Sequence, residues 1–197
     1  MLLSNLVPPP SDSVELEQYS ISGDLAARWL TDIAAFSDLA EGCTVADLGA
    51  GNGVLGLGAL AMGAGRATLV ETDQAACDVA KSNAESLGFA DSVEVIRATL
   101  GSDSVDIGSA DVVISNPPWG RQTPRADRPF LEAMIAAATP AHLLHSAEAT
   151  HIQPLFEAVG WAAERYGEAD FALPAAYSHH SRQRGRTRAA FWRLVPP

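Results

Sequence analysis

A short apolar run that leads through a glycine-rich turn into a helical segment is the feature that most constrains the fold of this chain. Residues 44–48 (TVADL) have the length and composition of a buried strand, and residues 54–62 (VLGLGALAM) are expected to form a helix that ends at Gly63 and Gly65. Between them stand Gly49, Gly51 and Gly53, which tolerate the positive φ angles of a sharp turn. A strand that enters a helix in this way is the first half of a βαβ unit and predicts a parallel sheet.

The same alternation recurs along the chain, so we expect one α/β domain over residues 1–197 with a Rossmann-like, doubly wound, seven-stranded sheet. The expected strands are residues 44–48, 67–71, 92–98, 110–116, 141–146, 161–173 and 187–195. The expected helices are residues 22–39, 54–62, 73–88, 128–138 and 148–159. The last two strands have no helix between them, which predicts a mostly parallel sheet with an antiparallel C-terminal edge strand. Residues 1–21 are expected to form an N-terminal arm, loose over residues 1–13.

Charge is distributed unevenly along the chain. The formal net charge of −11 opposes binding to phosphates, but residues 179–197 form a basic C-terminal segment with five arginines and no acidic residue. Arg182, Arg184 and Arg186 alternate, so on a strand they would share one face suited to an RNA backbone; a solvated basic tail is the alternative. The chain has no apolar run of the roughly 18 residues that a membrane helix needs, and residues 1–13 lack basic and apolar signal-peptide regions, so we expect no signal peptide. We therefore expect a cytoplasmic protein.

The glycine turn also predicts a ligand. Gly49, Gly51 and Gly53 follow GxGxG spacing, and Asp47 stands two residues before the first glycine. A dinucleotide site spaces its glycines as GxGxxG, so that pyrophosphate lies on the helix N-terminus. The different spacing and the preceding acid favour a ligand without phosphate. S-adenosylmethionine is such a ligand, because Asp47 can bind the ammonium of its methionine part; a plain tight turn is the alternative.

The second expected strand ends at Glu71, 18 residues after Gly53. In Rossmann-type sites a carboxylate at this position accepts hydrogen bonds from the ribose hydroxyls. Asp73 lies close enough to compete for that role, or else it caps the helix that begins at Gln74. We assign the ribose contact to Glu71. Together with the glycine turn, this residue predicts a nucleoside-cofactor site.

The residues Asn116-Pro117-Pro118-Trp119 (NPPW) follow the fourth expected strand and predict the chemistry. The lone pair of an amine on a planar π-system is delocalised, so such a nitrogen is a poor nucleophile. The side-chain carbonyl of Asn116 and the backbone carbonyl of Pro117 can accept both of its N–H bonds and draw it towards a tetrahedral shape. The prolines hold this backbone rigid, and Trp119 can stack on the ring. The alternative is a Pro-Pro turn beside a core tryptophan.

These residues together resemble the class I S-adenosylmethionine-dependent methyltransferases that modify exocyclic amino groups. Further segments are similar to the small-subunit rRNA adenine-N6 methyltransferase family (methyltransferase-like protein 5 and its archaeal relatives). Those segments are LEQY (16–19), NPPWG followed by Asp127 and Phe130-Leu131, and FALPAAYSHH (171–180). The resemblance spans nearly the whole chain.

The resemblance implies transfer of a methyl group from S-adenosylmethionine to N6 of one adenosine in small-subunit rRNA. It implies that Gln18, Thr99 and Asn116 contact the cofactor, and that Asp127 and His180 contact the RNA. It also implies a small zinc-containing activator protein that covers an exposed sheet edge. Because the base must leave its stack to reach the site, single-stranded or looped RNA is the favoured substrate.

The chain departs from the family pattern at two positions. Ile21 stands where the family has a cofactor-binding threonine, and Thr99 stands where it has an acid for the adenine amino group. Two other functions stay open. One is a protein glutamine-amide N-methyltransferase, because that amide nitrogen is also planar and suits NPPW, although LEQY and the arginine-rich tail speak against it. The other is a non-catalytic assembly factor that binds S-adenosylmethionine and rRNA, which the departures at Ile21 and Thr99 favour.

Two further groups of residues complete the expectations. Arg121, with other arginines around the NPPW loop, is expected to form a second RNA contact. His142 and His145 have the HxxH spacing of some metal sites, but they fall on an expected strand. Residues three apart on a strand lie on opposite faces, so we expect no metal site.

Overall fold

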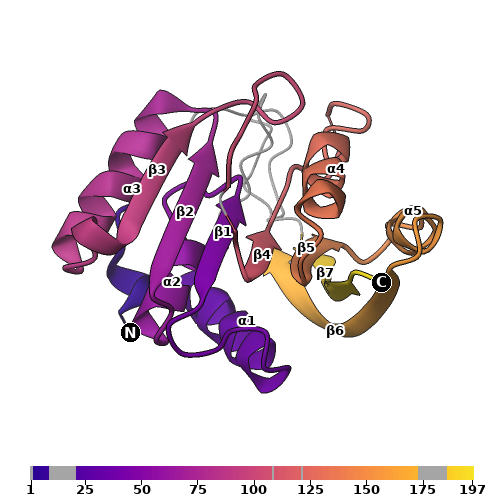
Figure 1. The fold of residues 1–197 in the computed structure, drawn as a ribbon, viewed down its shortest axis with the longest axis horizontal. Coiled ribbons are helices and arrows are strands. Elements are labelled where there is room, and N and C mark those ends of the chain that lie inside the picture. The colour runs from indigo at the N-terminus through magenta and orange to yellow at the C-terminus, as the bar shows by residue number, and fades with distance from the viewer. Residues whose placement is uncertain (1, 9–20, 108, 121, 173–185) are drawn as a thin grey trace.

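The computed structural model describes residues 2–8, 21–107, 109–120, 122–172 and 186–197. The described chain folds as a central sheet with helices on both faces (Figure 1). The seven strands are β1 (Thr44–Leu48), β2 (Arg66–Glu71), β3 (Val93–Arg97), β4 (Val112–Ser115), β5 (Ala141–Ser146), β6 (Ala162–Ala172) and β7 (Arg186–Val195). Their order in the sheet is β3-β2-β1-β4-β5-β7-β6.

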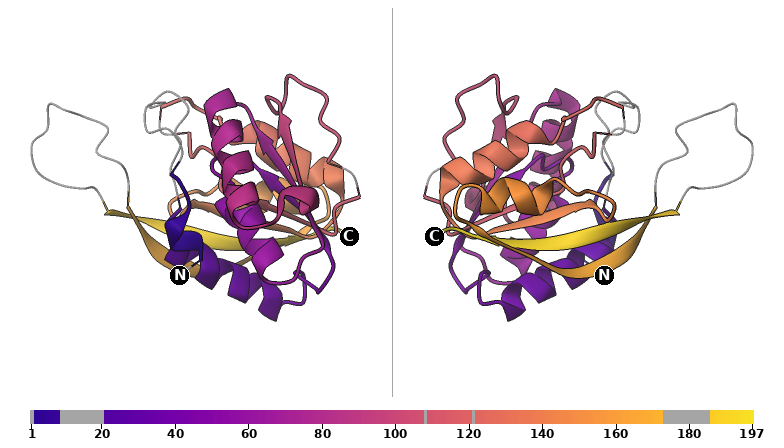
Figure 2. Two further views of the ribbon diagram at one scale, coloured as in Figure 1. Left: turned by 90° about the vertical axis from the view of Figure 1, so that its left-hand side faces the viewer. Right: turned by 90° about the vertical axis from the view of Figure 1, so that its right-hand side faces the viewer.

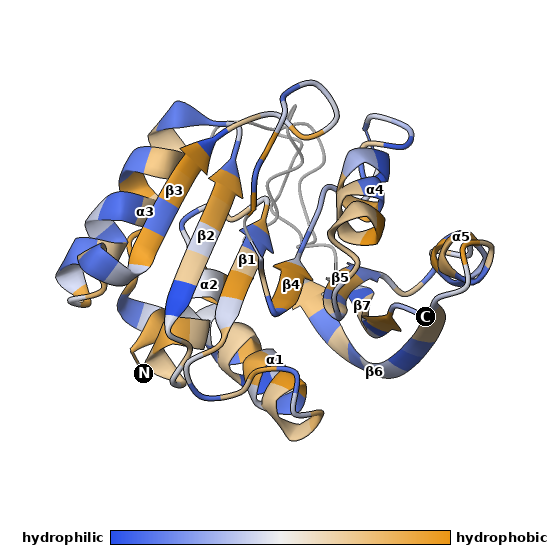
Figure 3. Ribbon diagram, viewed as in Figure 1, coloured by the Kyte–Doolittle hydropathy of each residue, from blue (hydrophilic) through white to orange (hydrophobic). Residues whose placement is uncertain are grey.

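The pairing of the strands confirms the predicted fold class. β1, β2, β3, β4 and β5 are parallel to one another, whereas β7 pairs antiparallel with β5 and β6 pairs antiparallel with β7. The long β6–β7 hairpin therefore forms one edge of the sheet, as expected for two consecutive strands without a helix between them. The central strands are mainly apolar because they are buried on both faces (Figure 3).

Five helices cover the two faces of the sheet (Figure 2). They are α1 (Gly23–Ala35), α2 (Val54–Ala61), α3 (Gln74–Ser86), α4 (Arg128–Ala137) and α5 (Ile152–Glu157). α1, α2 and α3 pack into one hydrophobic cluster, and α4 and α5 pack into a second cluster on the opposite face. Among the described residues, no helix has the length and apolar character needed to cross a bilayer.

α5 begins later than the sequence predicted. The expected helix covered residues 148–159, but the chain turns after β5, with the Ala149 N–H bonded to the Ser146 carbonyl at 3.1 Å, and the helix begins only at Ile152. Pro154 accounts for this start, because proline has no N–H and is tolerated only in the first turn of a helix. A start at residue 148 would have put the proline in the helix interior.

Residues 2–8, part of the arm expected to be loose, contact the rest of the protein, whereas residues 9–13 lie outside the described residues. Leu3–Asn5 form a short 3₁₀ helix, η1, and Leu3 packs against the α1–α2 cluster. A Cβ atom on Gly23 would lie 2.6 Å from the Leu3 backbone, and one on Gly58 would lie 3.0 Å from its side chain. The two glycines therefore leave the space that Leu3 fills.

Candidate active site

The register of β1 and β4 brings the glycine turn and the NPPW segment together. Leu48 of β1 lies opposite Ser115 of β4, and the Ser115 hydroxyl donates a hydrogen bond to the Leu48 carbonyl at 2.7 Å. Gly49 and Asn116 follow these two residues, so both segments leave the sheet side by side at its carboxyl edge. Sheets of this kind bind ligands at that edge, where the strand order changes direction.

The glycine turn has the backbone that the sequence predicted. Gly49, Gly51 and Gly53 have φ angles of 75°, 55° and 83°, a region that side chains with a Cβ rarely adopt. Nothing lies within 4 Å of the position that a Cβ atom on Gly51 would occupy. A ligand can therefore approach the backbone closely at this point of the loop.

Asp47 is a buried acid below the glycine turn. Its Oδ2 accepts a hydrogen bond from the Gly56 N–H at 2.9 Å, and its Oδ1 is buried without a hydrogen-bond partner among the described residues. Burial, with a smaller contribution from the negative charge of Glu71, raises the pKa of Asp47 to about 7 although the Gly56 N–H opposes the shift. A cationic ligand group would satisfy the unpartnered oxygen, which fits the ammonium of S-adenosylmethionine.

Glu71 ties the glycine turn to the end of β2. Its Oε2 accepts from the Gly51 N–H at 2.9 Å, and its Oε1 accepts from the N–H groups of Thr72 at 2.9 Å and Asp73 at 3.0 Å. A carboxylate has about four lone-pair sites, so capacity remains for a ribose hydroxyl. The Asp73 side chain accepts instead from the Ala75 N–H at 2.9 Å and caps α3, which is the helix-capping alternative considered above.

Thr99 lies after β3, where the family has an acid. It is exposed, its hydroxyl is 2.7 Å from the Thr72 hydroxyl, and its N–H donates to the Asp103 carboxylate at 2.7 Å. Asp103 is an acid near this position that the sequence analysis missed. The loop turns back on itself between Thr99 and Asp103. In the sequence, the presence of an acid in this loop is the sole indication of that contact.

Trp119, the aromatic residue of the NPPW segment, is enclosed by other aromatic rings. The side chain is 6% exposed, and its ring centroid lies 6.1 Å from that of His145 and 5.0 Å from that of Phe171. The rings of Trp119 and His145 are nearly parallel, with an interplanar angle of 27°. To stack on a substrate ring, Trp119 therefore needs one of these neighbours to move.

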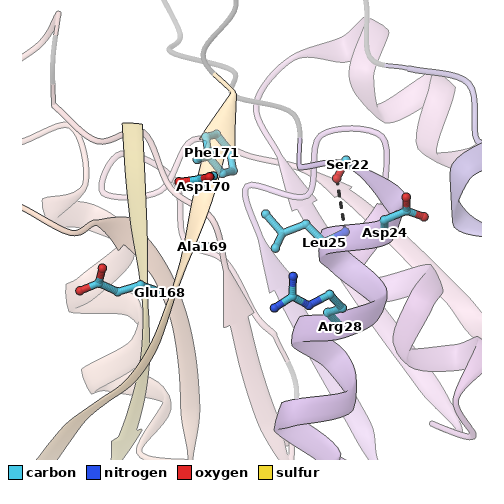
Figure 4. A pocket seen from close by; sticks show the side chains of 8 residues that line it. All are labelled: Ser22, Asp24, Leu25, Arg28, Glu168, Ala169, Asp170 and Phe171. Atoms are coloured by element: carbon cyan, nitrogen blue, oxygen red, sulfur yellow. Dashed lines mark hydrogen bonds between the residues drawn. The ribbon is translucent and has the colours of Figure 1, made fainter. Parts of the chain in front are cut away.

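A cavity of about 500 Å³ borders Phe171 (Figure 4). Its lining comes from the first turns of α1 and the end of β6, and consists of Ser22, Asp24, Leu25, Arg28, Glu168, Ala169, Asp170 and Phe171. The Ser22 hydroxyl accepts a hydrogen bond from the Leu25 N–H at 3.3 Å and so caps α1. Phe171 thus packs near Trp119 and also lines this cavity.

Asp127 is buried against two histidines. The Nε2 atom of His151 lies 2.5 Å from Asp127 Oδ2, and that of His145 lies 3.1 Å from the same oxygen. Burial acts to raise the pKa of Asp127, but the two imidazoles outweigh it and hold that pKa below its usual value. The Asp127 side chain is thus engaged within the protein, and a direct contact with RNA would require these neighbours to move.

His142 and His145 lie on opposite faces of β5, as predicted. The Nε2 atom of His142 lies 2.9 Å from Asp38, which also accepts two hydrogen bonds from Arg193 at 2.6 and 3.0 Å. His145 instead faces Asp127. In the sequence, spacing relates His142 only to His145, whereas the grouping of His145 with His151 depends on the fold and has no local sequence signal.

Several predicted site residues lie outside the described residues. These are Gln18, Arg121, His180, Arg182 and Arg184. Arg186 begins β7, where its backbone is in register with Ala172. Ile21, at the position of the family's threonine, is 7% exposed and belongs to the hydrophobic core.

Comparison with known proteins agrees with this geometry. The sequence profile of a family described as "Methyltransferase small domain" matches residues 24–148, more than half of the chain. The chain belongs to this methyltransferase family. Its similarity to relatives extends over nearly the whole length, which confirms the family resemblance drawn from the LEQY and NPPW segments.

Three relatives of this methyltransferase illustrate the similarity. The rRNA N(6)-adenosine-methyltransferase METTL5 of Danio rerio is 33% identical over 191 residues, covering 92% of this chain and 89% of METTL5. An uncharacterized protein of Methanocaldococcus jannaschii is 32% identical over 194 residues, covering 93% of this chain and 86% of that protein. The crystal structure of PH1948, a candidate RNA methyltransferase of Pyrococcus horikoshii, has a TM-score of 0.87 at 30% identity and covers 98% of this chain and 94% of its own.

Proposed function

We propose that this methyltransferase transfers a methyl group from S-adenosylmethionine to the N6 amino group of an adenosine in RNA, in particular small-subunit rRNA. The observation that carries the proposal is the position of Asn116 directly after β4, beside the glycine turn that follows β1. The similarity to METTL5 over 92% of the chain supports rRNA as the substrate.

The cofactor would be held by groups from β1, β2 and the loop after β3. Asp47 would bind the methionine ammonium, and the Gly49–Gly51 backbone would pass close to the nucleoside. Glu71 would accept the ribose hydroxyls, with Thr99 and Asp103 at the adenine end. S-adenosylmethionine supplies an electrophilic methyl group on a sulfonium. The unpartnered oxygen of Asp47 and the open space over Gly51 support this arrangement.

Asn116 and Pro117 would prepare the nucleophile. The adenine N6 lone pair is conjugated with the ring, and two N–H···O bonds to the Asn116 side chain and the Pro117 carbonyl would favour a pyramidal nitrogen. The nitrogen then forms a bond to the methyl carbon while the sulfur–methyl bond breaks. The methylated nitrogen is cationic at that point and loses a proton to water, so no protein base is needed.

The target base would have to reach Trp119 from outside its helix or loop. Extruding a base costs a few kcal/mol, and less when the RNA is single-stranded. In the protein, Phe171 packs on Trp119 and borders the cavity beside α1, so a shift of this ring would free the indole for stacking. Stacking on an aromatic ring is worth about 1–3 kcal/mol per base, enough to offset much of the cost of extrusion.

The proposal is tested by incubating the protein with labelled S-adenosylmethionine and unmodified small-subunit rRNA, at both low and molar KCl. Nucleoside mass spectrometry should detect N6-methyladenosine, and Asn116→Ala should abolish the product. A parallel reaction with a cell extract supplies any activator protein. Absence of a methylated nucleoside in every arm contradicts the RNA assignment.

The two alternative functions give different results in the same experiment. A glutamine-amide methyltransferase would label protein in the extract and leave the RNA unlabelled. An assembly factor without catalysis would bind S-adenosylmethionine and rRNA but transfer no methyl group. Cells that carry Asn116→Ala would then have the same phenotype as cells with the intact protein.

A further inference from the structure

Three side chains behind Trp119 have the chemistry and convergence of a metal site. We propose that Asp127, His145 and His151 bind one divalent transition-metal ion, with Zn²⁺ as the best match to the donor set. Their ligand atoms all lie within 4.8 Å of one another. The site is separate from the residues proposed for methyl transfer, and its test does not depend on the proposed function.

The three ligands come from different elements that meet at the carboxyl end of β5. Asp127 directly precedes α4, His145 lies on β5, and His151 directly precedes α5. Both imidazole Nε2 atoms approach the same carboxylate oxygen, Oδ2 of Asp127. The two nitrogens and this oxygen thus form a compact triangle of ligand atoms that one shared ion can join.

The separation between His145 and Asp127 also fits two ligands of one ion. Their atoms are 3.1 Å apart, yet His145 is 1% exposed and neither ring nitrogen has a partner with hydrogen-bond geometry among the described residues. Two donors at the usual Zn²⁺ distances of about 2.0–2.1 Å would lie roughly 3.0–3.4 Å apart. The observed distance between His145 Nε2 and Asp127 Oδ2 falls within that range, and the His145 ring does not meet the geometry of a hydrogen bond to this oxygen.

The His151 side chain is exposed, so it can shift to bind an ion and leaves a path for the ion from solvent. Its Nε2–H group donates to the Asp127 carboxylate at 2.5 Å, so this distance must lengthen by under about 1 Å for both groups to bind Zn²⁺. The His151 side chain is 51% exposed and can make this adjustment. Its exposed side also leaves a path for the ion and a position for water.

The donor set selects the class of ion. Two imidazoles and one carboxylate suit Zn²⁺ and neighbouring first-row ions such as Co²⁺, whereas Mg²⁺ and Ca²⁺ prefer oxygen ligands. A bound ion would join the starts of α4 and α5 to β5, directly behind the ring of His145 that packs against Trp119. Its role is therefore to hold the NPPW side of the site in place, since methyl transfer itself requires no metal.

The test measures metal binding by untagged protein that has been stripped with EDTA. Titration with ZnCl₂ against a chromogenic chelator should give one Zn²⁺ per chain with a micromolar or lower Kd. A hundredfold excess of Zn²⁺ over that Kd should raise the melting temperature by roughly 5–10 °C. CoCl₂ should give visible d–d absorption that ZnCl₂ removes.

Two variants assign the binding to the cluster. His151→Ala removes an exposed ligand and its hydrogen bond to Asp127, so the variant should melt somewhat below the wild type in EDTA, and its Zn²⁺ affinity should fall at least about tenfold. Asp127→Asn should weaken binding similarly. The control is the double variant His179→Ala/His180→Ala, which removes an adjacent histidine pair elsewhere in the chain and should leave the affinity unchanged.

Three results would overturn the proposal. The first is no Zn²⁺ binding at concentrations on the order of 0.1 mM. The second is a Zn²⁺ affinity that His151→Ala leaves unchanged. The third is a Zn²⁺ affinity that only the control variant His179→Ala/His180→Ala abolishes. In each case Asp127, His145 and His151 would be a purely hydrogen-bonded cluster.

Discussion

The Glu71 carboxylate accepts a hydrogen bond from the Gly51 N–H at 2.9 Å, which links the end of β2 to the glycine turn after β1. The side chain is 7% exposed, and its other oxygen accepts two further backbone N–H groups. One residue therefore shapes the loop and presents a carboxylate to it. A substitution that removes the charge of Glu71 would therefore disturb both the shape of the loop and the carboxylate that faces it.

We predict that Glu71→Gln lowers the affinity for S-adenosylmethionine at least about tenfold, because an amide NH₂ would face backbone N–H groups that need an acceptor. Isothermal titration calorimetry measures the change. The matched control is Asp73→Asn, which keeps a good cap on α3 and should leave the affinity unchanged. A larger loss in Asp73→Asn than in Glu71→Gln would assign the ribose contact to Asp73.

Asp47 predicts a pH dependence of cofactor binding. Burial raises its pKa to about 7, so the carboxyl is mostly protonated at pH 5.5 and can attract the ligand ammonium only after it loses the proton. The affinity for S-adenosylmethionine should therefore rise about tenfold between pH 5.5 and 7. Methylthioadenosine, which lacks the amino-acid part, should show no such rise. Asp47→Asn should remove the dependence, and an unchanged profile in that variant would contradict this role.

Asn83 is expected to hold the N-terminal segment on the cofactor loop. It is 1% exposed, exchanges two hydrogen bonds with the backbone of Val7, and donates to the Asn52 carbonyl at 3.0 Å. Asn83→Ala should cost about 2–3 kcal/mol of stability and remove the protection of residues 2–8 against hydrogen–deuterium exchange. Gln74→Ala on the same helix changes only an exposed bond to Asp78 and should preserve that protection. Equal exchange in both variants would show that Asn83 does not anchor the segment.

The basic C-terminal segment is expected to bind RNA phosphates. Replacing Arg182, Arg184 and Arg186 with Gln should weaken RNA binding and lower the slope of log Kd against log salt by about 2, since each phosphate contact on single-stranded RNA contributes roughly 0.7. The affinity for S-adenosylmethionine should not change. Arg66→Gln is the control, because Arg66 is exposed at the start of β2, at the edge of the sheet opposite the NPPW segment. A slope that stays the same in the triple variant would make the segment a solvated tail.

The parts of the fold and site that were predictable have local sequence signals. The bounds of β1 and β5 match the expected strands, because short buried strands end at glycines or polar turns. The glycine turn and the NPPW segment lie at the same sheet edge for a simple reason: parallel strands have their carboxyl ends on one side. The helix cap at Asp73 was also readable as a local pattern.

The parts that were missed depend on contacts between distant residues. Asp127, His145 and His151 come from three elements, and no spacing in the sequence relates them. Leu3 is ordered because Gly23 and Gly58 leave space for it, which a search for periodic apolar residues in the first segment cannot detect. Asp103 reaches Thr99 only through the turn of the loop after β3.

The most direct test of the central claim compares Asn116→Ala with the wild type in cofactor binding and in methyl transfer to rRNA. In the proposed mechanism Asn116 holds the target amine beside the cofactor, so single-turnover transfer should fall at least about a hundredfold, or roughly 2.7 kcal/mol. The Kd for S-adenosylmethionine should stay within about fivefold, since the main cofactor contacts are proposed for Asp47 and Glu71. Transfer of N6-methyl groups at the wild-type rate by Asn116→Ala would contradict the account.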